Sequence, residues 1–435
     1  MTRISVGNIE PIGAVSAQRG ETWRTALAAA LVDAREYTRR AYAHLASSDP
    51  VFPRLAIVNP ARWELGHIAW FQEYWCMRHG IAWRAGDPAS CPVPSRFPHA
   101  DALFDSARVP HDARWSLPLP AWRGIDRYLD ETLAATLDGL ATCDDGARYF
   151  HELALHHEDM HGEALLMTLQ TLGFAPPDGL EPPRVGTGAG DAGDIAVPGG
   201  VRTLGSAAQV ARDRFVFDNE QDAHDVSIAP FAIARTCVTE GEYAAFVDAG
   251  GYRRDELWSS AGRYWRHGAG ATLPVAWRQS GAGFEVRWFD RWRALAPAAA
   301  MQHVNAHEAA AYCAWARRRL PTEAEWETAA ALVTDERDAA NLDARLGGPV
   351  AAASTATGSN FLGNVWEWTA SPFAPYPGFV AGPYAEYSQP WFGDHHVIRG
   401  GSWATRKRLV HARMRNFYRP ERHDMFVGFR TCAAG

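Results

Sequence analysis

The stretch from Tyr149 to Gly173, YFHELALHHEDMHGEALLMTLQTLG, limits the possible folds more than any other part of the chain, because it predicts one long helix rich in potential metal ligands. Residues four positions apart lie on one face of an α-helix, so His157 and His161 can both point at one ion. Imidazole is the commonest protein ligand for zinc, iron, copper and nickel, and two ligands leave such an ion needing at least one more. His67, in RWELGHIAWFQEYW, lies on a second amphipathic helix and is the predicted third ligand, since helix bundles build metal centres from facing helices.

Other interpretations of this helix remain open. Two histidines one turn apart also occur in ordinary packing, and the chain has 17 histidines, so the spacing alone does not establish a metal site. Glu163 follows His161 by two residues and points away from the His157/His161 face at about 100° per residue, so it is predicted to support a ligand or to be structural. His151 and His156 fall on other faces and are predicted to pack or to form hydrogen bonds.

The whole chain narrows the class of protein. With 435 residues it exceeds one ordinary hydrophobic core, so two domains, or three, are expected. A formal net charge of −7 argues against a nucleic-acid-binding protein, which usually carries a basic face. The 18 tryptophans indicate an aromatic-rich core, a lined pocket, or both.

The cysteines and the N-terminus indicate a compartment. The six cysteines form no CxxC pair, which favours reduced thiols in a cytosol over a disulfide framework. The N-terminus lacks the apolar run of a signal peptide, and no apolar window of 18 residues occurs. We therefore expect a soluble, cytoplasmic protein with no membrane and no nucleic-acid partner.

The first part of the chain predicts a bundle of four helices. Apolar residues recur at helical spacing over 21–46, about 60–79, about 119–142 and 149–173. Proline and glycine are frequent between 83 and 120, which predicts a long irregular connection containing a short helix near 100–106. A bundle with a long crossover between its second and third helices is therefore expected over residues 1–176.

A change of composition marks a second domain. Residues 177–200 are rich in proline and glycine and predict an extended linker. After it, over 201–435, short apolar runs such as VRTLGS, FVFDNE, HDVSIAPFAIA and FEVRWFD alternate with loops, and helices are predicted at 239–249 and 307–318. The fold class is therefore α+β, with the helical bundle first.

Several motifs of the second domain occur together in a known family. FAIARTCVTEGEYAAFVDAGGY, RRLPTEAEWETAA, GNVWEWT, RGGSW and the closing VGFR resemble the formylglycine-generating-enzyme fold, a variant of the C-type-lectin fold. The N-terminal bundle resembles the DinB-like domain. With GH at His67 and HxxxHxE at His157, His161 and Glu163, the combination resembles the ergothioneine-synthesising sulfoxide synthases and their relatives, the selenoneine synthases.

That resemblance implies a cofactor, a reaction and a division of labour between the domains. It implies a mononuclear non-haem Fe(II) held by His67, His157 and His161, the three residues that helix spacing also selects. It implies an oxidoreductase that uses O2 to form a carbon–selenium or carbon–sulfur bond at C2 of the imidazole of hercynine, the trimethylated betaine of histidine. The bundle would supply the metal ligands, and the second domain the substrate pocket.

The cysteines separate this chain from the formylglycine-generating enzymes proper. Those enzymes use a pair of active-site cysteines in the C-terminal part of the fold. The nearest candidates here, Cys237, Cys313 and Cys432, lie in no matching motif.

Hercynine carries a trimethylammonium group, which has no hydrogen-bond donor and is bound best by aromatic faces and a nearby anion. Asn416 with Phe417 is predicted to cradle hercynine, and Trp366 is a further candidate contact. The family also uses a tyrosine near the iron as proton donor, and Tyr376 is the first candidate here. The two other candidates in the same region are Tyr384 and Tyr387.

The donor of selenium or sulfur is predicted from departures from the γ-glutamylcysteine-using branch. That branch has an aspartate at the position of Tyr418 and keeps the arginine found here as Arg422. It also has two arginines where this chain has His111 and Arg114, and a histidine in place of Glu64. Loss of a carboxylate that would bind a cysteinyl ammonium group disfavours an amino-acid thiol, whereas a neutral, aromatic-walled pocket suits a sugar. A selenosugar is therefore favoured as donor.

Three alternatives remain open. The first is an ergothioneine sulfoxide synthase that uses cysteine or γ-glutamylcysteine. The second is a metal-dependent DinB-like thiol transferase with no redox step, and the third is a lectin-like binding module without catalysis.

Overall fold

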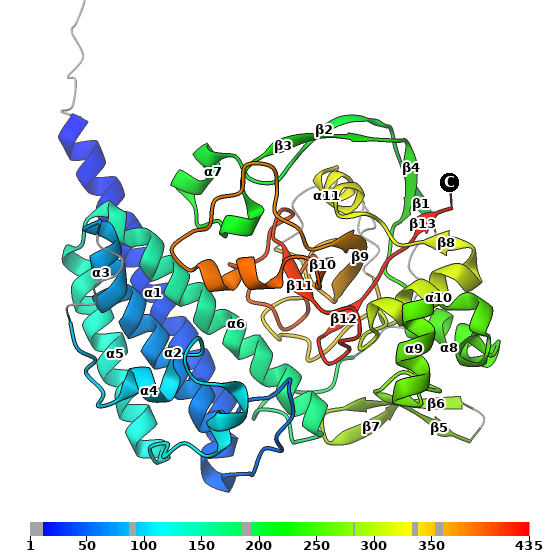
Figure 1. The fold of residues 1–435 in the computed structure, drawn as a ribbon, viewed down its shortest axis with the longest axis horizontal. Helices are drawn as coiled ribbons and strands as arrows, with labels where there is room; N and C mark the ends of the chain where they lie inside the picture. Colours follow the sequence, from blue (N-terminus) through cyan, green and yellow to red (C-terminus); the bar gives the residue numbers. More distant parts are fainter. Residues whose placement is uncertain are drawn as a thin grey trace, which may run out of the picture. The chain divides into compact units, whose positions relative to one another are not determined.

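A computed structural model describes residues 12–86, 93–184, 193–281, 283–332, 338–352 and 360–434 of the chain. It divides into two compact units, Met1–Gly162 and Glu163–Gly435, which we call the N-terminal and C-terminal units. The described part of the N-terminal unit is helical, and the C-terminal unit combines short sheets with helices (Figure 1). This composition agrees with the predicted α+β class.

The four predicted long helices are present in the order expected. They are α1 (Ile12–Ser48), α2 (Ala61–Glu73), α5 (Trp122–Thr142) and α6 (Arg148–Leu172). The long connection after α2 contains the short helix α4 (Ala100–Phe104), close to the predicted 100–106. Among the described residues, no helix combines the length and the apolar character needed to cross a membrane. Apolar side chains at helical spacing bury together in one cluster, which comprises Leu27, Leu31, Ala34, Leu140 and Leu155.

A buried arginine connects all four long helices. Arg35 of α1 is 2% exposed and donates Nε–H to Glu158 of α6 at 2.8 Å and Nη2–H to Gln72 of α2 at 2.7 Å. It also donates to the backbone carbonyl of Leu129 in α5. A charge removed from water is tolerated only where it is paired and hydrogen-bonded, so these contacts hold the helices in one register.

The second predicted helix corresponds to three consecutive helical elements: α2, a π-helical turn over Tyr74–Arg78, and α3 (His79–Arg84). Helical structure therefore runs beyond the end expected near His79. Gly80 does not end the helix. A Cβ atom at Gly80 would lie 2.0 Å from the Trp75 carbonyl oxygen, so glycine is required where the backbone closes up around the π turn.

The boundary between the two compact units lies inside a helix, since they divide between Gly162 and Glu163 of α6. The domain boundaries expected from the sequence, a bundle to 176 and a linker over 177–200, stay predictions. The last turns of α6 belong to the C-terminal unit because their polar side chains bond within it: Gln170 donates to the Arg287 carbonyl at 2.9 Å. Part of the predicted linker is β1 (Asp194–Val197), which pairs with β4, and residues 185–192 lie outside the described residues.

The described residues of the C-terminal unit form two four-stranded sheets and two smaller ones. In the first sheet the order is β1-β4-β13-β8, and in the second it is β11-β10-β9-β12. The strands of these sheets are β4 (Phe231–Ala234), β8 (Arg318–Arg319), β9 (Trp366–Pro372), β10 (His396–Arg399), β11 (Asn416–Tyr418), β12 (Val427–Gly428) and β13 (Cys432–Ala433). The smaller sheets comprise β2 (Gly200–Leu204) with β3 (His224–Ile228), and β5 (Trp277–Ser280), β6 (Gly283–Trp288) and β7 (Arg291–Ala294). The apolar run FVFDNE forms no strand and ends in a 3₁₀ turn, Asp218–Glu220.

The two predicted helices of this unit are present, and its described ranges contain three further helices that were not predicted. The predicted helices are α8 (Glu240–Asp248) and α10 (Ala306–Ala316), and the others are α7 (Ala208–Asp213), α9 (Ser260–Ala269) and α11 (Glu323–Ala331). A local signal for α11 was present. The Thr322 hydroxyl accepts the backbone N–H of Glu325, whose side chain returns to Thr322, and this capping box is the pattern T-x-x-E in the sequence.

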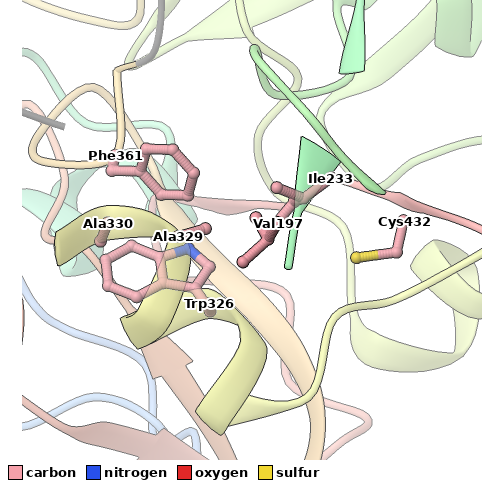
Figure 2. Packing of buried hydrophobic residues seen from close by; sticks show 7 residues of the cluster. All are labelled: Val197, Ile233, Trp326, Ala329, Ala330, Phe361 and Cys432. Carbon is pink, nitrogen blue, oxygen red and sulfur yellow. The ribbon is translucent and has the colours of Figure 1, made fainter. Parts of the chain in front are cut away.

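The core of the C-terminal unit joins the first sheet to α11. Trp326 of α11 is fully buried beside Val197 of β1 and Ile233 of β4, and Phe361 packs edge-on against its indole (Figure 2). Large aromatic side chains dominate such cores because each removes a large apolar area from water. The cluster explains part of the high tryptophan content as packing.

A fully buried ion pair lies beside this core. Arg430 and Glu367 are both 0% exposed, and the carboxylate accepts Nε–H at 2.5 Å and Nη2–H at 2.6 Å. Glu367 also accepts the indole N–H of Trp326 at 2.8 Å. The guanidinium donates further to the carbonyls of Ala234 and Arg235. The Arg430 and Glu367 charges therefore stabilise each other, because neither side chain is in contact with water.

Candidate metal centre

Three histidines converge in the N-terminal unit. One potential ligand atom from each of His67, His157 and His161 lies within 4.8 Å of the other two. His157 and His161 stand one turn apart on α6, and their Nε2 atoms are 3.1 Å from each other. His67 comes from α2 and is 3% exposed. Helix spacing thus brings the first two together, and packing of α2 near α6 adds the third.

The first ligand candidate is held in one tautomer. His67 donates its Nδ1–H to the carbonyl oxygen of Phe104, at 2.8 Å. The Nε2 lone pair is therefore available to a metal, and the backbone acceptor fixes the ring orientation. The Trp63 indole, one turn earlier on α2, stacks on this imidazole with ring centroids 5.0 Å apart and planes 8° apart.

His157 is held by stacking on α2. Its imidazole lies parallel to the Phe71 ring, with centroids 3.5 Å apart and an interplanar angle of 3°. His67 and His157 meet edge to face at 5.0 Å. The ring is thus fixed by apolar contact with the same helix that carries His67.

A carboxylate orients the third histidine. His161 donates Nδ1–H to Glu64 Oε1 at 2.5 Å, which leaves its Nε2 lone pair available. Glu64 lies one turn before His67 on α2, and the Asn59 side chain also hydrogen-bonds it. Burial, followed by the charge of Glu64, raises the pKa of Tyr42, which places this α1 residue beside the carboxylate.

Two of the imidazoles, those of His67 and His157, are neutral at physiological pH. Burial, and then the nearby His161, lower the pKa of His67 to about 3. Burial likewise lowers the pKa of His157 well below its ordinary value, and its two histidine neighbours add to the shift. Burial raises the pKa of Glu64, but His161, His67 and Asn59 more than offset this, so the group remains a carboxylate.

These residues fit a first-row transition metal. Neutral imidazole nitrogens suit divalent iron, cobalt, nickel, copper and zinc, whereas calcium and magnesium prefer oxygen ligands. Three protein ligands leave positions for small molecules, as in catalytic rather than structural sites. Among the described residues, this is the one group of three or more His, Cys, Asp or Glu side chains arranged to hold an ion.

The other polar residues of α6 have structural partners. Glu163 accepts hydrogen bonds from Ser402 at 2.5 Å, Thr405 at 2.8 Å and the Trp366 indole at 2.9 Å, all within the C-terminal unit. It is therefore structural, one of the two roles expected from its direction on the helix. His151 bonds the Ala147 carbonyl at 2.9 Å, which agrees with the predicted packing or hydrogen-bonding role.

Two of the three predicted hercynine contacts, Asn416 and Phe417, lie on one short strand. Asn416 hydrogen-bonds Tyr418, and alternation along β11 directs Phe417 to the opposite face. The Phe417 ring stacks on Phe373, with centroids 3.9 Å apart. The Asn416 side-chain oxygen also accepts the backbone N–H of Phe417 at 2.8 Å, while the Phe417 ring lies on the other face of the strand. Trp366, on β9, is 1% exposed.

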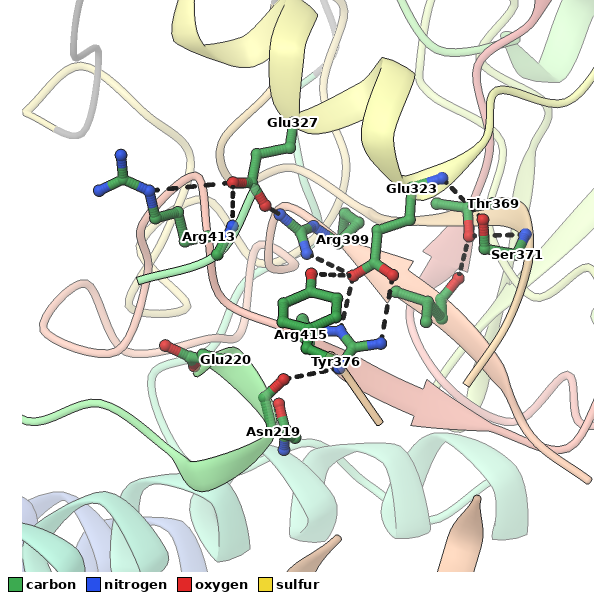
Figure 3. Close-up of polar contacts among 12 residues, drawn as sticks. Asn219, Glu220, Glu323, Glu327, Thr369, Ser371, Tyr376, Arg399, Arg413 and Arg415 are labelled. Atoms are coloured by element: carbon green, nitrogen blue, oxygen red, sulfur yellow. Dashed lines mark hydrogen bonds and ion pairs between the residues drawn. The ribbon is translucent and has the colours of Figure 1, made fainter. Parts of the chain in front are cut away.

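Tyr376 lies in a buried network of charges (Figure 3). Its hydroxyl donates to Glu323 Oε1 at 3.0 Å, and the same oxygen accepts from Arg399 at 2.7 Å and from Arg415 at 2.6 Å. The Arg415 guanidinium lies over the tyrosine ring, 4.0 Å from its centroid. Burial, and then the Glu323 charge, raise the pKa of Tyr376, so it keeps its proton at neutral pH.

The two alternative tyrosines lie close to each other. Tyr384 and Tyr387 have ring centroids 6.0 Å apart. Tyr387 stacks on Phe217 at 4.3 Å and meets Phe417 edge to face at 5.7 Å.

The arginines predicted to bind the donor both have internal partners. Arg422 makes a two-pronged ion pair with Asp424, at 2.5 and 2.6 Å, and its guanidinium lies 5.2 Å from the Tyr418 ring centroid. In the N-terminal unit, Arg114 donates to Asn59 at 2.7 Å and lies over the Trp63 ring at 3.8 Å.

Sequence reasoning did not assign Glu64 to the centre. Glu64 and His67 are three positions apart, a spacing that places two side chains on one helix face, so the local signal was available. The partner, His161, is 97 positions away in sequence. Local spacing cannot show that such a pair meets.

The sequence of this chain is similar to one family model and to several proteins of known name. Residues 187–342 and 351–434 match the family model described as the sulfatase-modifying factor enzyme 1-like domain. A hercynine oxygenase of Mycolicibacterium thermoresistibile is 36% identical over 442 residues, covering 94% of this chain and 94% of that protein. A hercynine oxygenase of Mycobacterium tuberculosis is 36% identical, covering 86% and 91%. A formylglycine-generating enzyme of Streptomyces coelicolor is 28% identical, covering 60% and 94%. The DinB-like nature of the helical unit stays a prediction.

Proposed function

Because this chain belongs to the hercynine oxygenase family, we propose that it is an O2-dependent enzyme that joins selenium, or sulfur, to C2 of the hercynine imidazole. The observation that carries the proposal is the group of three histidines, two of them buried, whose ligand atoms lie within 4.8 Å of one another. We assign His67, His157 and His161 as ligands of Fe(II). Iron bound there supplies the activation of O2, which a protein side chain cannot do unaided.

The overall reaction balances with one O2 per turnover. The C2–H bond of hercynine and the Se–H or S–H bond of the donor are replaced by one carbon–selenium or carbon–sulfur bond. One oxygen atom leaves as water, and the other remains on the chalcogen as a selenoxide or sulfoxide. The protein must bring three reactants together, so its main contribution is positioning.

We propose that the C-terminal unit binds hercynine and supplies a proton. Asn416 offers an amide to the substrate, and Phe417, which is partly exposed on the other face of β11, offers aromatic surface suited to trimethylammonium; Trp366 is buried and lines the site only from behind. Tyr376 is the proposed proton donor. Burial and the Glu323 charge raise the pKa of its hydroxyl, so the group carries its proton at neutral pH.

A selenosugar is the favoured donor. An arginine already bonded by two oxygens of Asp424 is a weak receptor for the carboxylate of an amino-acid thiol. Burial raises the pKa of Tyr418 to about 12, so its hydroxyl is neutral and can bond a sugar hydroxyl. Arg114 is similarly engaged, with Asn59 and Trp63. These contacts favour a donor without charge.

The test is a parallel assay of donors. Protein prepared anaerobically with Fe(II) receives hercynine and O2 together with a selenosugar, cysteine or γ-glutamylcysteine, and products are identified by mass. Hercynine deuterated at C2 reports the bond that breaks. We expect a conjugate that lacks the deuterium, formed fastest with the selenosugar.

The control arms separate the alternatives. Omission of O2 should stop product formation, whereas a thiol transferase would turn over equally well without it. A conjugate formed only with cysteine or γ-glutamylcysteine would assign the chain to ergothioneine-type synthesis. Absence of any hercynine conjugate with all three donors would overturn the proposed function.

Removing the internal partner of Arg422 should change donor preference. In Asp424→Asn the guanidinium loses its paired carboxylate and can bind that of a substrate, so we expect the rate with γ-glutamylcysteine relative to selenosugar to rise about tenfold. Tyr418→Asp should likewise alter donor preference more than hercynine affinity. Competition assays with both donors present measure the ratio.

The matched control for this change is Asp394→Asn. Asp394 is an exposed aspartate that pairs with Arg419 at 3.0 Å, so this variant should keep the wild-type ratio. Unchanged preference in both Asp424→Asn and Tyr418→Asp would contradict the assignment of this part of the chain to donor recognition.

A further inference from the structure

We propose that Glu64 is a positioning residue of the metal centre, which orients His161 and strengthens its bond to the ion. The inference rests on the proposed function only in assuming that the three histidines hold iron. Glu64 is not a ligand candidate itself, since it bonds Nδ1 of His161 and leaves Nε2 as the nitrogen that would hold the metal.

The geometry makes Glu64 a link between both ligand-bearing helices. It is 7% exposed and lies one turn before His67 on α2, while its Oε1 accepts Nδ1–H of His161 on α6 at 2.5 Å. A side chain that leaves α2 beside one ligand thus fixes the ring of another. Rotation of the His161 imidazole would break this bond and leave the largely buried carboxylate without its partner, which makes other orientations costly.

The carboxylate is itself held in place. The Asn59 side chain hydrogen-bonds Glu64, and Asn59 also accepts from Arg114 at 2.7 Å. Arg114 lies against Trp63 at 3.8 Å, so this positive charge is fixed close to the carboxylate. The Glu64 carboxylate is therefore held in its orientation by these neighbours, and its bond to His161 is present before a metal binds.

The candidate ligands differ in the strength with which their Nε2 atoms donate to a cation, because their Nδ1–H groups have different hydrogen-bond acceptors. His67 donates to the neutral carbonyl of Phe104, whereas His161 donates to a charged carboxylate. A hydrogen bond to a carboxylate is stronger and increases electron density on the imidazole, so Nε2 of His161 becomes the better donor to a cation. Glu64 also brings one negative charge near an ion that otherwise has three neutral ligands.

Metal affinity tests the assignment without any substrate. Fe(II) binding under anaerobic conditions, in competition with a chelator, is measured for the wild type, Glu64→Gln and Glu64→Ala. We expect about 10- to 100-fold weaker binding in Glu64→Gln and a further loss in Glu64→Ala. The amide oxygen of glutamine still accepts Nδ1–H but lacks the charge, so the two variants separate charge from orientation.

Co(II) supplies a second measurement that a general loss of stability would not change. Its visible absorption depends on ligand geometry, so we expect the spectrum to shift in Glu64→Ala and to shift less in Glu64→Gln. The matched control is Glu152→Gln on α6, which removes a carboxylate paired with Arg148 at 2.9 Å and should keep wild-type affinity and spectrum.

The outcomes distinguish this inference from the proposed function. Wild-type affinity and an unchanged Co(II) spectrum in both Glu64 variants would overturn the role of Glu64, even if hercynine were converted. Weakened binding would support it even if no hercynine product formed, since the assay contains the metal alone. Thermal unfolding of the metal-free proteins identifies any variant that fails to fold. Glu64→Gln preserves the size of the side chain and a hydrogen-bond acceptor, so its metal affinity can be compared with that of the wild type even if Glu64→Ala does not fold.

Discussion

His161→Ala is expected to bind no iron and to form no product. The variant keeps two of three ligands, and an ion held by His67 and His157 alone is readily removed by a chelator. Product formation should fall by at least about a thousandfold, because a bound metal contributes several kcal/mol to catalysis. The bundle should stay folded, since alanine favours helix and the His161 side chain is 18% exposed. Iron content per chain and circular dichroism measure the two effects.

The control is a second histidine on the same helix. His151→Ala removes a side chain that bonds the Ala147 carbonyl and is not part of the cluster, so its iron content should equal that of the wild type. Wild-type iron content in His161→Ala would remove this residue from the ligand set. Loss of iron in both variants would show only that α6 tolerates no change.

Arg430→Met is expected to lower the free energy of unfolding by about 3–5 kcal/mol, because it leaves the Glu367 carboxylate charged and without its partner in the core. Both side chains are 0% exposed, so water cannot replace the lost guanidinium. Urea unfolding followed by tryptophan fluorescence measures the change, since Trp326 donates to the same carboxylate.

An exposed pair supplies the control for this substitution. Arg254 and Glu256 are 43% and 65% exposed, so Arg254→Met should change the free energy of unfolding by no more than about 0.5 kcal/mol. In the double variant Arg430→Met with Glu367→Gln, removal of the stranded charge should recover part of the stability. Equal destabilisation by Arg430→Met and Arg254→Met would contradict the importance of burial.

The helical part of the fold was predictable because its information is local. Apolar residues at a spacing of three and four mark α1, α2, α5 and α6, and the same periodicity places His157 above His161. The additional turns after His79 were not predictable, because the π turn depends on how Gly80 packs against the backbone at Trp75. Helix α11 was missed although its capping box is visible in the sequence.

The partners of the candidate site residues were not predictable. The Tyr376 hydroxyl lies on Glu323, 53 positions earlier, and Glu163 is bonded by residues more than 200 positions later. Nothing in the local pattern distinguishes these side chains from free catalytic groups. Asp424, by contrast, is only two positions from Arg422, yet its ion pair depends on a turn whose geometry the sequence does not specify.

By itself the sequence determined the four long helices of the N-terminal part, the face shared by His157 and His161, and the order of a helical part before a mixed one, because periodicity and spacing act within a few residues. Only the tertiary structure decided that Glu64 and the Phe104 carbonyl orient the histidines. It also decided that the units divide inside α6 at Gly162. The physical reason is that such contacts depend on the packing of segments tens to hundreds of residues apart.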